Sequence, residues 1–154
     1  MLKAGQFAPD FELADVGANR HTLAALLRDG PVLLAFFKSS CPVCQMTLPY
    51  LDRLAAAGGI RVFGVSQDYT STTLDFLVHF ELHFPTLVDE AAEGFVVSNG
   101  FGLTHVPSMF VVDRDNSISW ASDGFLKRDL EALGKRFGFT MFGPQDKVPE
   151  WKPG

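Results

Sequence analysis

The chain has 154 residues, of which 47% are hydrophobic and 20% are charged, which is close to the composition of an ordinary globular domain. This composition excludes a disordered chain, and the length allows one domain to bury a substantial apolar core. The formal charge of -5 and the scattered Lys and Arg residues argue against a nucleic acid or a membrane surface as partner.

The sequence shows no targeting signal and no boundary between domains. No segment reaches the roughly 18 consecutive apolar residues of a membrane span, and the first residues lack a secretory signal pattern. We therefore expect a cytoplasmic protein, or a periplasmic one if a leader has been removed. Without repeats or linkers, residues 1–154 are predicted to form one domain, with a core over about 4–137 and an irregular tail over 138–154.

The first half of the chain predicts two strand regions and one helix. Residues 11–13, with a turn at 17–19, indicate a small N-terminal hairpin or added strand. The continuous apolar run over 31–37 is typical of a strand that is covered on both faces. A helix is expected to begin at the cysteines that follow and to end at Gly58, with a kink at Pro49.

A second strand and helix come next. Residues 61–66 have the length and apolar content of a strand. The helix after them is expected to begin near residue 70 and to carry Leu74, Leu77 and Val78 on one face. A strand, a helix, a strand and a helix in this order predict a parallel pair of strands.

The last third predicts a short helix, a hairpin and a closing helix. Asp89 is placed to cap a helix over about 90–98. The segments 108–112 and 117–121 flank a polar turn and are typical of a β-hairpin. Apolar residues spaced by three and four predict a final helix over 126–137. Together the elements indicate an α/β fold with a mixed central sheet and helices on both faces.

The two cysteines of the chain, Cys41 and Cys44, carry the chemistry that the sequence suggests most strongly. So short a disulfide loop adds little stability, which favours a chemical role over a structural one. Residues three apart on a helix lie on one face, close enough to form a disulfide, and the helix start stabilises a thiolate. We expect Cys41 to be the exposed nucleophile and Cys44 the buried resolving thiol of disulfide exchange. This chemistry requires neither a cofactor nor a metal.

Two other uses of the cysteines remain open. They could join His79 and His83 in a zinc site, although the spacing is much longer than that of a zinc finger. Haem attachment would need a histidine at position 45, where the chain has Gln45. A redox-inert binding domain is a third possibility, and the intact cysteine pair argues against it.

Three segments resemble one family when taken together. Residues 5–13, 32–51 and 102–113, the second of which contains Cys-Pro-Val-Cys, are similar to the TlpA/ResA-like thioredoxin family of the AhpC/TSA–redoxin superfamily. The resemblance covers about residues 4–137. It implies a thioredoxin-like fold with an N-terminal β extension, and a thiol-disulfide oxidoreductase. Such an enzyme acts on a protein or small-molecule disulfide or dithiol and uses a separate electron donor.

The resemblance also implies a substrate-binding wall. It identifies Val106–Pro107 as a cis peptide bond beside the cysteines, where the backbone before the proline binds a peptide. We expect Val106 and Pro107 to contact the substrate together with Ser40, Pro42 and Val43. The Pro42–Val43 pair is further expected to tune the reduction potential.

The sequence departs from the thioredoxin pattern at two positions. Thioredoxins have a buried Asp six residues before the first cysteine, where this chain has Ala35, and an aromatic residue where it has Ser40. Another acid or a water must then handle the proton of the resolving thiol. A peroxiredoxin, a thiol peroxidase with antioxidant activity, is the runner-up. It would need Thr or Ser three residues before the reactive cysteine, with a proline further upstream. This chain has Lys38 three residues before Cys41 and Cys41 itself three residues before Cys44, and no proline lies at the required position.

The remaining candidates near the pair have open roles. Lys38 either lowers the pKa of Cys41 or is a solvated lysine at a strand end, and Ser40 either donates to the thiolate or caps the helix. His105 is expected near the site, as a surface residue or a proton shuttle. Gln67 and Asp68 follow a strand at the sheet edge where open α/β sheets place their sites.

Overall fold

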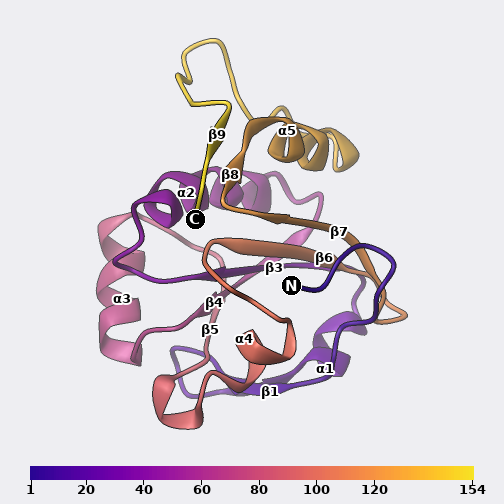
Figure 1. Ribbon diagram of the computed structural model, residues 1–154, viewed down its shortest axis with the longest axis vertical. Coiled ribbons are helices and arrows are strands. Elements are labelled where there is room, and N and C mark those ends of the chain that lie inside the picture. Colours follow the sequence, from indigo (N-terminus) through magenta and orange to yellow (C-terminus); the bar gives the residue numbers. More distant parts are fainter.

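The computed structural model describes all 154 residues and arranges them around a five-stranded mixed sheet (Figure 1). The strands, in sheet order, are β5 (Thr86–Val88), β4 (Arg61–Ser66), β3 (Val32–Phe37), β6 (Ser108–Val112) and β7 (Ile118–Asp123). The central strand β3 pairs in parallel with β4 and antiparallel with β6. The predicted α/β fold with a mixed sheet is confirmed, and so are the strands expected over 31–37, 61–66 and 108–112.

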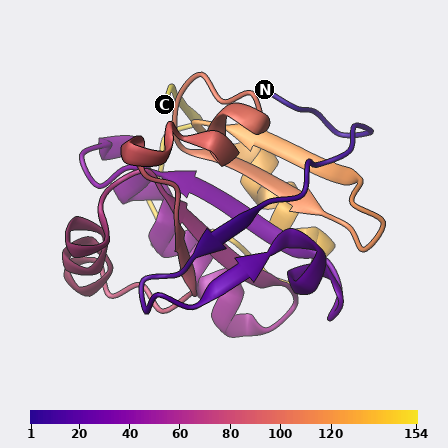
Figure 2. The same cartoon turned by 90° about the horizontal axis from the view of Figure 1, so that it is seen from below.

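Helices cover both faces of the sheet. They are α1 (Leu23–Leu27), α2 (Pro42–Ala57), α3 (Thr70–His79), α4 (Val96–Gly100) and α5 (Lys127–Arg136), with a 3-10 turn, η1 (Ala91–Glu93). In Figure 1, α2 and α5 lie above the sheet, while α1, α4 and the hairpin of β1 (Glu12–Ala14) and β2 (Arg20–Thr22) lie below it. Figure 2 shows this lower layer in front of the strands. None of the helices is both long and apolar enough to cross a membrane.

The central strand β3 is a rigid support for the loop that follows it. All six of its residues are buried. Phe36 packs against Phe101 and Phe110, with ring centroids 5.2 and 5.8 Å apart. Phe37 stacks on Phe76 of α3 at 5.2 Å. Each fully buried aromatic side chain contributes about 1.5–3 kcal/mol relative to an exposed one, so the end of β3 is well fixed.

The N-terminal segment runs from one edge of the sheet to the other. The N–H of Gly5 donates to the carbonyl of Ile118 at 2.8 Å, and Ile118 donates back to Gln6 at 2.8 Å, which covers the edge at β7. Further along, Val16 donates to Thr86 at 3.1 Å at the opposite edge, β5. The predicted N-terminal β extension therefore exists, and it bonds to both outer strands of the sheet.

The face of α3 that packs inward differs from the prediction. Leu74 and Val78 are 42% and 78% exposed, whereas Thr73 and Phe76 are buried. Leu77, the third residue of the expected face, is partly buried against the core. The Thr73 hydroxyl lies 2.7 Å from that of Ser66, so the inward face of α3 is centred on Thr73 and Phe76. A polar residue with a buried partner thus outweighs the leucine pattern.

The segment after Asp89 also differs. In place of one helix over 90–98, η1 comes first and α4 follows it. Asp89 is fully buried and accepts hydrogen bonds from the N–H groups of Val97 and Ser98 at 3.2 and 2.7 Å, so it binds the first turn of α4. β5 and α1 were not predicted, because they are only three and five residues long and too short to show a periodicity in the sequence.

The C-terminal tail has one regular element. A short strand, β9 (Trp151–Lys152), pairs antiparallel with β8 (Phe125–Leu126), which leads into α5. Met141 is buried, and the Phe142 ring packs edge-on against Tyr50 of α2 with centroids 4.8 Å apart. The tail expected to be irregular over 138–154 is therefore packed on the body and contains a strand.

Candidate active site

The cysteine pair lies where β3 gives way to α2. Pro42 occupies the first turn of α2, where its missing N–H costs nothing, and the helix continues through Pro49 to Gly58. Cys41 is the N-cap residue and has extended backbone angles, φ -89° and ψ 111°. The helix predicted to begin at the cysteines and end at Gly58 is confirmed, and it places Cys41 at its positive end.

The two thiols differ in exposure. Cys41 is partly buried and Cys44 is fully buried. The Sγ atom of Cys41 accepts a hydrogen bond from the backbone N–H of Cys44 at 3.0 Å, and in its protonated form it donates to the carbonyl oxygen of Val106 at 3.5 Å. The partly exposed sulfur of Cys41 thus lies between the start of α2 and the segment 105–107.

The surroundings separate the pKa values of the two thiols. The pKa of Cys41 falls from 9.0 to about 6, chiefly because the Cys44 thiol donates a hydrogen bond to it. Burial opposes this shift, while the N–H groups of Cys44 and Val43 and the charge of His105 reinforce it. The pKa of Cys44 is raised, first by burial and then by its hydrogen bond to Cys41. At neutral pH, Cys41 is a thiolate and Cys44 keeps its proton, which are the protonation states that an attacking and a resolving thiol require.

The Val106–Pro107 segment lies across from Cys41. Its peptide bond is cis, and both residues are buried. Neither the N–H nor the C=O of Val106 takes part in a backbone hydrogen bond. The only partner of the carbonyl is the Cys41 thiol. The backbone N–H and C=O of Val106 are therefore free of backbone partners directly beside the reactive sulfur.

Ser39, in the loop before Cys41, is held from two directions. The carboxylate of Asp68, which follows β4, accepts the N–H of Ser39 at 2.7 Å. The side-chain amide of Gln45 donates to the Ser39 carbonyl at 2.8 Å. The negative charge of Asp68 also helps to raise the pKa of Cys44. Asp68 thus fixes the loop and affects the resolving thiol electrostatically.

The other predicted residues next to the cysteines have different surroundings. Ser40 is exposed, and its hydroxyl has no hydrogen-bond partner, so it neither caps the helix nor donates to Cys41. Pro42 is exposed and Val43 partly buried. The ammonium of Lys38 lies 5.8 Å from the centre of the Phe95 ring. Lys38 is not among the groups that lower the pKa of Cys41, and the charge that does so belongs to His105.

The more distant candidates divide into two groups. His105 is near the site and forms an ion pair with Asp123 at 2.5 Å, while Gln67 donates to Ser98 at 2.9 Å. The histidines of the alternative zinc site lie elsewhere. His79 packs on Phe80, and His83 bonds to Asp52 at 3.0 Å. The structure does not bring them to the cysteines, and it contains no cluster of three possible metal ligands.

Sequence reasoning did not identify three residues of this region. Gln45 contacts Ser39 in the loop before Cys41. Asp123 pairs with His105, and Gly154 packs against Val106. Each of these contacts joins positions that share no motif or helical spacing. A single sequence carries no signal for them.

Comparisons with known proteins agree with this geometry. The model of the AhpC/TSA family matches residues 4–121. A protein named thiol-disulfide oxidoreductase ResA, from Geobacillus kaustophilus, is 26% identical over 135 residues, which are 84% of this chain and 75% of that protein.

Two solved structures have the same fold. Peroxidoxin BcpB from Mycobacterium tuberculosis has a TM-score of 0.74 and 27% identity, over 92% of this chain and 97% of that one. A thio-disulfide isomerase from Thermus thermophilus has a TM-score of 0.71 and 25% identity, over 90% and 99% of the two chains. The predicted thioredoxin-like fold is confirmed.

Proposed function

Because the chain belongs to the AhpC/TSA family, we propose that it is a thiol-disulfide oxidoreductase in which Cys41 attacks and Cys44 resolves. The observation that carries the proposal is the division of labour within the pair. A partly exposed sulfur with a pKa of about 6 lies next to a fully buried one whose pKa is raised. Zinc binding or a purely structural role would require neither difference.

The reaction proceeds in two exchanges. The Cys41 thiolate attacks one sulfur of a substrate disulfide, the substrate S–S bond breaks, and the departing thiolate takes a proton from solvent. Cys44 then loses its proton and attacks the Cys41 sulfur of the mixed disulfide. The second substrate thiol leaves, and Cys41 and Cys44 are joined as a disulfide. The substrate has gained two electrons and two protons, and an external dithiol restores the enzyme by the reverse steps.

The substrate and the electron donor belong to this proposal. The expected contacts for a disulfide or dithiol are Val106, whose carbonyl oxygen lies 3.5 Å from the Cys41 sulfur, and Pro107 after it. Ser40 and the first residues of α2, Pro42 and Val43, are expected to complete them. No cofactor is needed, since both electrons pass through sulfur. We retain the cytoplasmic location expected from the sequence. There the thiol-reducing surroundings would make the enzyme a reductase.

The chain has no acid at position 35 to take the proton of Cys44, because this position holds the fully buried Ala35. The carboxylate of Asp68 is the acid whose charge acts on Cys44. We assign it the role of positioning the loop and raising the pKa of the resolving thiol. This role keeps Cys44 protonated until the mixed disulfide has formed.

A thiol peroxidase is the second candidate, and two observations favour it. Cys41 has the lowered pKa of a reactive thiol, and the chain is similar to a peroxidoxin. Position 38 weakens this candidate, because it holds a lysine, whose ammonium lies over Phe95, in place of the expected Thr or Ser.

Titration of the two thiols across a series of glutathione potentials tests the main proposal. Cys41 and Cys44 should oxidise together as a two-electron couple, with a tenfold change in the ratio over about 30 mV. The protein should also catalyse the reduction of insulin disulfides when dithiothreitol supplies the electrons. Two cysteines that never oxidise together would rule out the proposed function and favour a redox-inert binding domain.

A further inference from the structure

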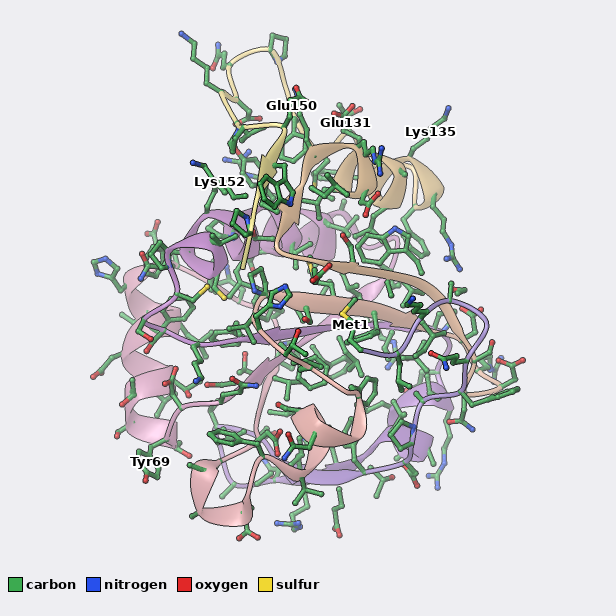
Figure 3. The ribbon with its side chains drawn as sticks, viewed as in Figure 1. Met1, Tyr69, Glu131, Lys135, Glu150 and Lys152 are labelled. Atoms are coloured by element: carbon green, nitrogen blue, oxygen red, sulfur yellow. The ribbon has the colours of Figure 1, made fainter.

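The backbone of Val106 is covered by the C-terminal tail. Trp151 and Lys152 pair with β8, and the N–H of Lys127 donates to the Glu150 carbonyl at 3.0 Å, which directs the tail along the body. In Figure 1, β9 ends beside the start of α2, and Figure 3 shows Lys152 on this strand. The tail therefore reaches the active site from the side of β8.

Gly154 of the tail lies directly on the Val106 peptide. A Cβ atom added to Gly154 would overlap the carbonyl oxygen of Val106 and lie 2.6 Å from Cδ2 of His105. Gly124 shows the same tight fit, since a Cβ there would lie 2.6 Å from the Lys152 carbonyl. An extended peptide needs the Val106 backbone to dock as a strand. Gly154 occupies that space.

A small cavity remains open on the other side of Val106. Its volume is about 180 Å³, and its lining includes Lys38, Gln67, Thr104 and His105. His105 is paired with Asp123, whereas Lys38 forms no ion pair with a carboxylate. The free cation at the rim of the cavity is thus the ammonium of Lys38.

From these contacts we propose that the site acts on low-molecular-weight disulfides that carry a carboxylate, and that Gly154 excludes extended polypeptides. The inference rests on the proposed thiol-disulfide function and names its substrate class. The cavity accepts the polar substituent of the attacked sulfur. Lys38 attracts its carboxylate, and the tail prevents a strand from pairing with Val106.

Three disulfides test the size and charge preference. Oxidised glutathione is small and anionic, cystamine is small and cationic, and insulin offers extended chains. Rates per Cys41 thiolate should decrease in the order oxidised glutathione, cystamine, insulin. Equal rates for insulin and oxidised glutathione would overturn the proposal.

The tail is tested with Gly154→Ala, whose new methyl group cannot fit against the Val106 backbone. If the tail lies away from Val106 in about 10% of the wild-type molecules, displacing it in all molecules should raise the rate of insulin reduction about tenfold. The preference among small disulfides should not change. Gly143→Ala is the matched control in the same tail, because its Cβ would meet only the Asp146 carboxylate, at 3.6 Å. Deletion of residues 151–154 is the second test and should act like Gly154→Ala. An unchanged insulin rate in both variants would contradict the role of the tail.

Lys38→Gln tests the charge. The ratio of the oxidised glutathione rate to the cystamine rate should fall about two- to fivefold, the range that one exposed ion pair supplies. A ratio that does not change would remove Lys38 from the proposal. If the wild-type protein reduces none of the three disulfides, the proposed function itself fails. If it reduces all three with no preference, only the substrate class fails.

Discussion

The backbone N–H of Cys44 donates to the sulfur of Cys41 at 3.0 Å, so the resolving residue stabilises the attacking thiolate before any substrate arrives. The Cys44 thiol adds a second hydrogen bond, which is the main reason that the pKa of Cys41 falls to about 6. One residue therefore activates the nucleophile first and later attacks its sulfur in the mixed disulfide, which releases the substrate thiol.

The reactivity of Cys41 should follow its pKa. With a value of about 6, roughly nine-tenths of Cys41 is thiolate at pH 7, and the fraction falls as the pH drops through 6. Alkylation by iodoacetamide, measured as a rate against pH, should show its midpoint near 6. Cys44 is buried and should remain unmodified on the same timescale. A midpoint near that of free cysteine, about 8.5, would contradict the described site.

Cys44→Ala should raise the pKa of Cys41. The substitution removes the thiol donor, which is the largest of the lowering causes, and retains the backbone N–H of residue 44. The alkylation midpoint should therefore move to higher pH while remaining below that of free cysteine. The same midpoint in the variant and the wild type would show that the thiol of Cys44 does not activate Cys41.

The roles of the two cysteines can be separated by trapping. Cys41→Ser should abolish disulfide exchange, because the attacking sulfur is lost. Cys44→Ser should accumulate a mixed disulfide with the substrate, visible as an added mass that dithiothreitol removes. If the Cys41→Ser variant kept the wild-type rate, the assignment of attacking and resolving thiols would be wrong.

Sequence reasoning identified the central part of the site because that part is local. A buried strand, a Cys-x-x-Cys pair and a helix with proline in its first turn are adjacent in the chain, and their patterns predict Cys41 at the start of α2. The order of strands and helices predicted the mixed sheet for the same reason. Each of these features depends on periodicity or on neighbouring residues.

The remainder depends on contacts between distant segments. Asp68 and Ser39 are 29 positions apart, and their hydrogen bond requires the parallel pairing of β3 with β4. The orientation of α3 depends on the buried contact between Thr73 and Ser66, which outweighs the leucine pattern. The position of Gly154 on Val106 requires the β8–β9 pairing. The two exposed residues of β9 carry no sequence pattern that predicts this pairing.

Asp68 should matter for stability and for the resolving step. Asp68→Ala leaves the Ser39 N–H without its charged acceptor and should lower the free energy of unfolding by about 1 to 2 kcal/mol. Asp68→Asn keeps an oxygen acceptor and should recover much of this loss. Both variants should lower the pKa of Cys44, because the negative charge is gone. Urea unfolding and the pH dependence of mixed-disulfide resolution measure the two effects. A purely structural role would change only the unfolding.

Hydrogen peroxide distinguishes the oxidoreductase from the peroxidase. The reduced protein should consume peroxide no faster than a free thiolate, because position 38 lacks the hydroxyl expected of a peroxiredoxin and its lysine lies over Phe95. Peroxide consumption with a recycling dithiol provides the measurement, with Cys41→Ser as the control. Turnover far above that of free cysteine, lost in Cys41→Ser, would reverse the ranking of the two functions.

The N-terminal segment that bonds to Ile118 at one edge of the sheet and to Thr86 at the other also affects how copies of the protein meet. An uncovered outer strand offers its peptide groups to any strand that approaches, which is a common route to aggregation. Here one continuous piece of chain covers part of both outer strands. Association of two copies through these edges would first require the N-terminal segment to detach from β5 and β7. The covered edges therefore disfavour pairing between sheets, while the loop at Cys41 remains accessible for disulfide exchange.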